Sequence, residues 1–188
     1  MIGRSLFESE SLRLTLFDPE KDLEVESSFT YQLDYAYLLR RKPLRPMGPG
    51  ELRKIHEELQ KQMEEKDNRF NYAVRQRSDD QLVGIMLIPR LHWMGGVAEL
   101  AVRMGTPSLQ EQYLPEALRM ALTYCFSELG LFRLRILVPE YDLALTGACE
   151  QAGLQHEVCR RQALYRRGRY WDEQYYGILQ SEWLPVED

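Results

Sequence analysis

The sequence predicts a mixed α/β fold built around two parallel strands and the helix that joins them. Val97–Met104 alternates between its two faces, one apolar and the other carrying Glu99 and Arg103, which is the period of a strand. Phe132–Val138 alternates in the same way. Between them, apolar residues recur with the spacing of an amphipathic helix, at Leu114, Ala117, Leu118, Ala121, Leu122, Cys125 and Leu129. A crossover helix of this length favours a parallel pair of strands.

Turn residues set the expected limits of that helix. Pro115 is suited to its first turn and Gly130 to its C-terminal end. A ligand is then expected at the carboxyl ends of the two strands, beside the N-terminus of the helix.

The chain before Val97 is expected to add three strands and helical segments to this centre. Ser11–Phe17 alternates as a strand, and Phe70–Arg75 with Leu82–Pro89 predicts an antiparallel hairpin. Asp22–Arg41 and Glu51–Lys66 have helical patterns, the first one rich in aromatic residues. The proline- and glycine-rich segment between them, at 42–50, is either a mobile lid or a simple linker.

Composition predicts one cytoplasmic domain that spans residues 1–188. A hydrophobic content of 44% is enough for a sizeable core. The net charge of −5 argues against nucleic acid as a partner and leaves small molecules or proteins. Cys125, Cys149 and Cys159 are odd in number and lack metal-ligand spacing, so a reduced protein without a metal is expected. No apolar run has the length of a signal peptide or a membrane span, so no membrane association is expected.

Two later stretches resemble a known family. PEALRMAL with YCFSELGL, within Pro115–Leu131, and the aromatic pattern of Gly168–Trp183 are similar to a GNAT-superfamily acyltransferase, in the branch that acetylates ribosomal-protein N-termini. The resemblance implies a single mixed α/β domain whose sheet splays between two parallel strands. It also implies that acetyl-CoA binds in the splay and that the acetyl group moves to an amine. The acceptor would be a protein N-terminus or a small molecule, and a homodimer is left open.

The resemblance assigns the cofactor to three places. Backbone N–H groups at Val102, Arg103 and Met104 would polarise the carbonyl and pair with the pantetheine arm. Asp142 stands where the family has a helix-capping Asn. The diphosphate would meet the segment made of Leu109, Gln110, Glu111, Gln112, Tyr113 and Leu114.

That last segment departs from the family pattern Arg/Gln-x-x-Gly-x-Gly/Ala. Gln110 and Gln112 occupy both glycine positions, and Glu111 replaces what is often a basic residue. Glycines let backbone N–H groups close on phosphates, and a carboxylate repels a polyanion. A second hypothesis therefore stands beside the enzyme: a non-catalytic binding or dimerisation module with the same fold.

Side-chain roles also follow from the resemblance. Glu99 would draw the proton from the amine through water, or it is a salt-bridged strand residue. Cys149, in place of a Tyr, would protonate the leaving thiolate, or it is a small core residue. Tyr31 and Tyr35, in the segment that forms a wall of the acceptor cleft, and His92 are candidates for substrate contact; simple packing is the alternative. Five arginines of the closing hairpin could hold a phosphate or an acidic partner, or form a solvated face: Arg160, Arg161, Arg166, Arg167 and Arg169.

Overall fold

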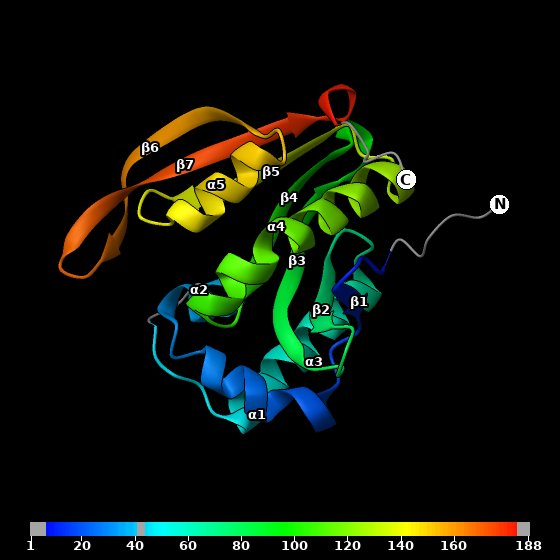
Figure 1. The fold of residues 1–188 in the computed structure, drawn as a ribbon, viewed down its shortest axis with the longest axis vertical. Helices are drawn as coiled ribbons and strands as arrows, with labels where there is room; N and C mark the ends of the chain where they lie inside the picture. Colours follow the sequence, from blue (N-terminus) through cyan, green and yellow to red (C-terminus); the bar gives the residue numbers. More distant parts are fainter. Residues whose placement is uncertain (1–6, 41–43, 184–188) are drawn as a thin grey trace.

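A mixed sheet of seven strands, in the order β1-β2-β3-β4-β5-β7-β6, runs through the part of the chain that the computed structural model describes, residues 7–40 and 44–183 (Figure 1). The strands are β1 (Leu12–Thr15), β2 (Phe70–Gln76), β3 (Leu82–His92), β4 (Val97–Met104), β5 (Arg133–Pro139), β6 (Gln155–Arg166) and β7 (Arg169–Leu179). The β4–β5 pair is parallel, and the other neighbouring pairs are antiparallel. The predicted mixed α/β fold is therefore confirmed.

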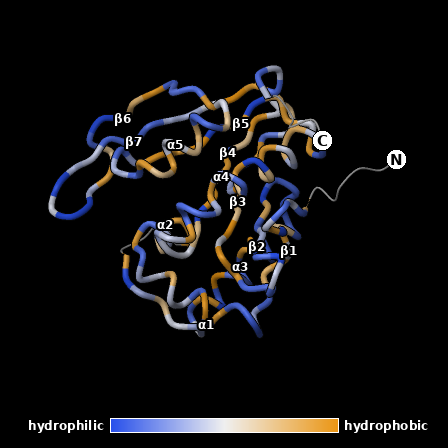
Figure 2. Tube along the Cα trace, in the orientation of Figure 1, coloured by the Kyte–Doolittle hydropathy of each residue, from blue (hydrophilic) through white to orange (hydrophobic). Residues whose placement is uncertain are grey.

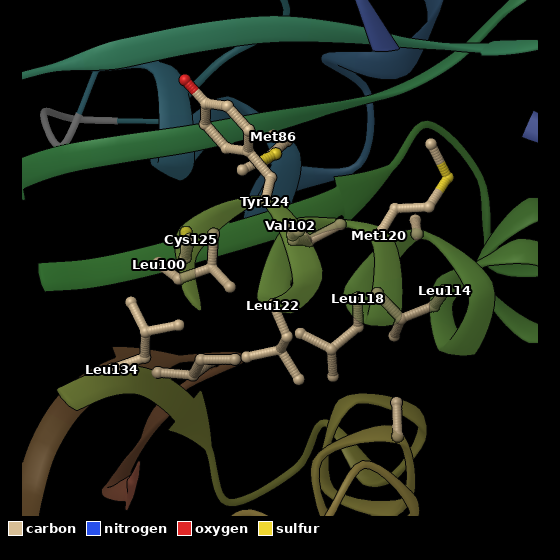
Figure 3. Close-up of a cluster of buried hydrophobic side chains, with 14 of the residues drawn as sticks. Met86, Leu100, Val102, Leu114, Leu118, Met120, Leu122, Tyr124, Cys125 and Leu134 are labelled. Carbon is tan, nitrogen blue, oxygen red and sulfur yellow. The ribbon is translucent and has the colours of Figure 1, made fainter. Parts of the chain in front are cut away.

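Helices cover both faces of the sheet. They are α1 (Pro19–Phe29), α2 (Leu33–Arg40), α3 (Pro49–Glu65), α4 (Pro107–Thr123) and α5 (Leu143–Gln151), with short helical turns η1 (Trp93–Gly95), η2 (Tyr124–Glu128) and η3 (Gln180–Glu182). On one face α4 buries Leu114, Leu118 and Leu122 against Leu100 and other residues of the sheet (Figure 3). On the other face, α1–α3 pack against β2 and β3. Hydropathy follows these layers: Figure 2 is orange along β3 and mostly blue at the tip of the β6–β7 hairpin.

The helix α4 begins at Pro107 and not at Pro115, so the prediction of its start is wrong. Thr106 caps it through a bond from the Leu109 N–H to the Thr106 hydroxyl, and Pro107 follows at the first helical position. Extending the helix backwards also buries Tyr113 and Leu114. Pro115 therefore lies inside the helix, where it cannot donate the usual bond to the carbonyl of Glu111.

Other helix boundaries follow local signals in the sequence, and one predicted helical segment is divided into two helices. Asp18 caps α1, Asp142 caps α5, and Gly130 ends the helical run after η2 with φ of +59°. The helical segment predicted at Asp22–Arg41 is two helices, because the chain turns between Phe29 and Leu33. Residues 42 and 43 of the predicted lid or linker, and Arg41 at the end of the predicted helical segment, lie outside the described residues.

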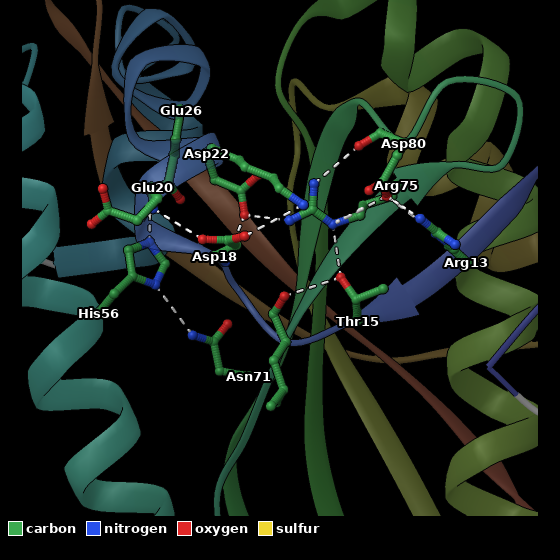
Figure 4. A network of polar contacts seen from close by, with 12 residues as sticks. Arg13, Thr15, Asp18, Glu20, Asp22, Glu26, His56, Asn71, Arg75 and Asp80 are labelled. Atoms are coloured by element: carbon green, nitrogen blue, oxygen red, sulfur yellow. Dashed lines mark hydrogen bonds and ion pairs between the residues drawn. The ribbon is translucent and has the colours of Figure 1, made fainter.

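A buried polar network ties the α1–α3 layer to the edge of the sheet (Figure 4). Arg75 of β2 donates to Asp22 of α1 at 2.5 Å and to the Thr15 hydroxyl at 2.8 Å. His56 of α3 is 2.6 Å from Glu26 of α1. Because the four side chains of Arg75, Asp22, His56 and Glu26 are buried, each needs its partner, and the network fixes where α1 and α3 sit on the sheet.

The centre of the sheet is bent where β4 and β5 separate. Their ladder joins Val97 to Arg133 and ends with Glu99 opposite Arg135. On the other side of β4, the register with β3 shifts between Leu87 and Arg90, and Pro89 in this bulge cannot donate to a ladder. Beyond Glu99, β4 continues with β3 and β5 continues with β7, so the two strands diverge.

Candidate active site

A cavity of about 180 Å³, here called the central cavity, lies where β4 and β5 separate. Glu99–Arg103 of β4 and Ile136 and Leu137 of β5 line it from the sheet. Three other parts of the chain complete the lining: α2, the chain from the end of β5 into α5, and the β6–β7 hairpin. Their residues are Asp34, Tyr37, Leu38, Pro139, Tyr141, Leu145, Arg160, Ala163, Leu164, Arg166 and Glu173.

Glu99 is the acidic side chain at the point where the strands part. It is 7% exposed, and its carboxylate accepts a bond of 3.3 Å from the guanidinium of Arg135 on the neighbouring strand. It also lines the central cavity. A carboxylate held in this way can accept a hydrogen bond or a proton from a group bound in the cavity.

Ion pairs and hydrogen bonds fix the walls of the central cavity. Arg160 donates to Glu173 at 2.6 Å, and the hydroxyl of Tyr141 donates to Asp34 at 2.6 Å. Arg166 lies 3.6 Å from Asp34. Burial, helped by the bond to Asp34, raises the pKa of Tyr141 above its usual value, so this hydroxyl stays protonated at neutral pH.

A second cavity of about 210 Å³, the helix-end cavity, lies at the N-termini of α4 and α5. A side-chain bridge spans the wide end of the gap between the strands here. Arg103 of β4 and Gln110 of α4 both donate to the carboxylate of Asp142, the latter at 2.9 Å. Arg103, Asp34 and Tyr141 line both cavities, so the bridge lies where the central cavity and the helix-end cavity adjoin.

The family that the fold and this site point to is found directly from the sequence. The family described as acetyltransferase (GNAT) domain matches residues 13–155, which include β1 to α5 and both strands of the gap. The chain belongs to this family. Its match supports the resemblance to the superfamily, while the branch that acetylates ribosomal proteins is not distinguished by it.

Individual proteins with a similar sequence or fold also bear the names of acetyltransferases. An uncharacterized N-acetyltransferase, YnaD of Bacillus subtilis (strain 168), is 26% identical over 121 residues, which are 62% of this chain and 68% of the relative. A solved structure described as a probable acetyltransferase superposes with a TM-score of 0.79 at 22% identity, covering 93% of this chain and 96% of the other. Spermidine N-acetyltransferase from Vibrio cholerae, in complex with CoA and spermine, gives a TM-score of 0.75 at 19% identity and covers 91% and 96%.

Acetyl-CoA, which GNAT acetyltransferases use, is predicted to contact this chain at two places, the end of β4 and the start of α4. Beyond Glu99 the β5 side of β4 has left the ladder, which suits a pantetheine arm at Val102–Met104. In the segment predicted to meet the diphosphate, Leu109–Leu114 is helical, and Tyr113 and Leu114 are in the core. Glu111 lines the helix-end cavity, and its carboxylate would repel a diphosphate bound there.

Of the other predicted site residues, two are buried and two are exposed. Cys149 is fully buried in the core, and burial raises its pKa to about 12. Tyr35 is also buried, and its hydroxyl donates to Glu26. Tyr35 lines the helix-end cavity as well. Tyr31 is exposed and lines a third cavity, of about 360 Å³, beside Arg166, Arg167 and Trp171. His92 is exposed at the far end of β3, where it accepts a bond from the Gly95 N–H.

Three site residues were missed by the sequence reasoning. Asp34 and Tyr141 are bonded to each other in the lining of the central cavity, and Arg135 holds Glu99. Arg135 could have been found from the sequence, because it is a charged residue in the second predicted parallel strand and pairs with Glu99 of the first. Asp34 and Tyr141 are 107 residues apart and follow no motif, so only the fold brings them together.

Among residues 7–40 and 44–183, no group of three or more His, Cys, Asp and Glu side chains is arranged to hold a metal ion. No helix within those described ranges is both long and apolar enough to cross a membrane.

Proposed function

We propose that this protein transfers an acetyl group from acetyl-CoA to a primary amine bound in the central cavity. The observation that carries the proposal is the placement of buried Glu99 at the point where β4 leaves its ladder with β5, facing a cavity. Membership of the GNAT family supports acetyl transfer. The acceptor is a protein N-terminus or a small molecule; spermidine N-acetyltransferase and a putative ribosomal-protein-serine acetyltransferase, both from Vibrio cholerae, represent these two kinds among similar folds.

In this proposal the residues of the chain prepare the amine and hold it. Glu99 accepts a proton from the ammonium form of the acceptor, through water, because an amine must be neutral to attack a carbonyl. Arg135 keeps the Glu99 carboxylate in place. Asp34, which accepts the bond from the Tyr141 hydroxyl, offers a further carboxylate acceptor for an ammonium or amine group bound in the cavity.

Acetyl-CoA supplies the activated thioester. Backbone groups of Val102–Met104 would hold its pantetheine arm. Cys149 is proposed to be a core thiol only, because it is fully buried and does not line the central cavity. No step is assigned to the diphosphate, because residues 109–114 are helical and two of them, Tyr113 and Leu114, are buried.

The experiment is isothermal titration of the protein with acetyl-CoA, in parallel with a variant that carries Gln110→Gly, Glu111→Gly and Gln112→Gly. Binding by the natural sequence, with a dissociation constant on the order of micromolar, supports the enzyme. An amine screen then follows, with Glu99→Gln as the control. Binding by neither protein would overturn the assignment of the donor.

A second function is favoured by the bridge at Asp142. Gln110 and Arg103 fill the wide end of the gap, as expected of a GNAT fold kept as a binding or dimerisation module. Titration separates the two: binding of acetyl-CoA by the triple-glycine variant alone would favour the module.

A further inference from the structure

The third cavity, of about 360 Å³, lies between the start of α2 and the turn of the β6–β7 hairpin. Residues 31–34 line it from the chain that enters α2, and three residues line it from the hairpin: Arg166, Arg167 and Trp171. Asp34, Tyr141 and Arg166 line the central cavity as well. The two cavities therefore adjoin, and a molecule whose amine lies in the central cavity reaches the third cavity with the rest of its length.

The charges that line the third cavity do not cancel. Asp34 is the one acidic residue among its described lining residues, and Arg166, which lies 3.6 Å from the Asp34 carboxylate, balances it. Arg167 is exposed, and no hydrogen bond or ion pair joins it to another described residue. One positive charge is therefore left over, at a place that a bound molecule can reach.

The first turn of α2 adds to this positive potential. The helix begins at Leu33, which lines the third cavity. The N–H groups in the first turn of a helix have no partner within the helix, and this end of the helix carries a partial positive charge. The start of α2 and the guanidinium of Arg167 thus favour the same kind of ligand, an anion.

Arg167 occupies a position that turn geometry does not reserve for arginine. It is the first of the two residues that join β6 to β7, with φ of +50°, and Gly168 follows with φ of +80°. Hairpin turns in which both residues have positive φ favour Asn, Asp or Gly. The turn therefore gains nothing from an arginine, and replacement by Asn removes the charge while it keeps a residue that suits this backbone.

Aromatic side chains complete the lining of the third cavity. Tyr31 is 70% exposed. Trp171 is held by the ring of Tyr141, with centroids 5.1 Å apart, and by the guanidinium of Arg169, which lies 3.4 Å from the centroid of the Trp171 ring. These rings offer apolar contact to the part of a molecule that joins its amine to an anionic group.

We propose that the third cavity binds a carboxylate of the acceptor, so that the protein prefers primary amines that carry a carboxylate at a distance. This inference rests on the proposed function, which places the amine beside Glu99. Glu99 lines the central cavity and Arg167 lines the third cavity, and neither lines both. In an α-amino acid a single carbon separates the amine from the carboxylate, which is too short a span. A peptide with an acidic residue near its N-terminus, or a longer amino acid, has the required length.

The first measurement is binding, by isothermal titration without acetyl-CoA. One set consists of peptides with a free N-terminus and an amidated C-terminus, identical except for a glutamate, glutamine or lysine at the third position. The other set compares para-(aminomethyl)benzoate with its carboxamide. The anionic member should bind about tenfold more tightly than the neutral one, because a charge-assisted hydrogen bond replaces a neutral one. A preference in the peptide set alone would identify a protein N-terminus as the acceptor, and one in the other set alone a small amine. No preference in either set would overturn the proposal.

Variants of the hairpin show whether Arg167 causes the preference. Arg167→Asn should remove it and leave the binding of the neutral compounds unchanged, and Arg167→Glu should make the lysine peptide the tightest ligand. Arg161→Asn is the matched control, because Arg161 is an exposed arginine of the same hairpin that does not line the third cavity. It should keep the preference. A preference that survives Arg167→Asn, or an equal loss for charged and neutral compounds, would overturn the proposal.

Acetylation of the same compounds, measured as kcat/KM, separates this proposal from the proposed function. An anionic preference in binding without any acetylation would support the carboxylate site and overturn acetyl transfer. Acetylation with equal kcat/KM for anionic and neutral compounds would support acetyl transfer and overturn the carboxylate site.

Discussion

Glu99 is the residue on which the proposed chemistry depends. Replacing it by Gln keeps the size of the side chain and the acceptor for Arg135, but removes the ability to take a proton. Acetylation of a chosen amine should fall by about 10²–10⁴-fold in kcat, with the melting temperature nearly unchanged. Arg135→Gln is the companion variant, since it only releases the carboxylate and should cost less. Equal rates for the natural protein and the Glu99→Gln variant across pH 6–9 would leave Glu99 as a salt-bridged strand residue.

Gly105 shows how closely the turn after β4 is packed. A methyl group there would overlap ring atoms of Phe29, which α1 supplies from the other layer. We expect Gly105→Ala to lower the free energy of unfolding by about 1–3 kcal/mol, because the ring or the turn must move. Urea denaturation measures this. Gly147→Ala is the matched control: it has open space around it in α5, and it should be neutral or stabilise by about 0.5–1 kcal/mol.

At the scale of elements, the first two turns of α4 decide whether the helix end can accept a diphosphate. Pro115 leaves the carbonyl of Glu111 without its helical donor, and proline is also a favourable first residue of a helix. The segment from Pro107 to Leu114 is thus the part of α4 that can unwind while Pro115 starts the remaining helix, at the cost of disturbing buried Tyr113 and Leu114.

Pro115→Ala tests this directly. The alanine restores the missing donor and should stabilise the long form of α4 by up to about 3 kcal/mol. If acetyl-CoA binds only when the two turns unwind, its affinity should fall while the melting temperature rises. Titration and a thermal melt on the same sample measure both. Unchanged affinity with a higher melting temperature would mean that the diphosphate lies elsewhere.

The same helix shows where sequence reasoning succeeds and where it stops. Local patterns predicted β4, β5, the β2–β3 hairpin and the cap at Asp142, because alternation, turn residues and caps act over a few positions. They did not reveal that Thr106 and Pro107 start the helix ahead of Pro115, since both starts have good signals and long-range burial of Tyr113 decides between them. Asp34 and Tyr141 meet only through the fold, which no local pattern encodes.

At the scale of the whole molecule, buried acidic groups predict the response of stability to alkali. Burial raises the pKa of Cys125 and of Cys149 to about 12, from an ordinary value near 9. Both thiols therefore stay neutral in the folded protein while they ionise in the unfolded chain. Their favourable contribution is complete below pH 9 and is lost as the pH rises from 9 toward 12.

We expect the free energy of unfolding to fall above pH 9, with each of these two thiols adding up to about 1.4 kcal/mol per pH unit to the slope. Buried Tyr35 and Tyr124, whose pKa values burial also raises, add to the loss at higher pH. Urea denaturation from pH 8 to 10.5 measures the slope, and Cys125→Ala should reduce it by the share of one thiol. A slope equal in the two proteins would mean that the Cys125 thiol titrates alike in both states. The core around η2 would then admit water to this side chain, against its complete burial between α4 and the sheet.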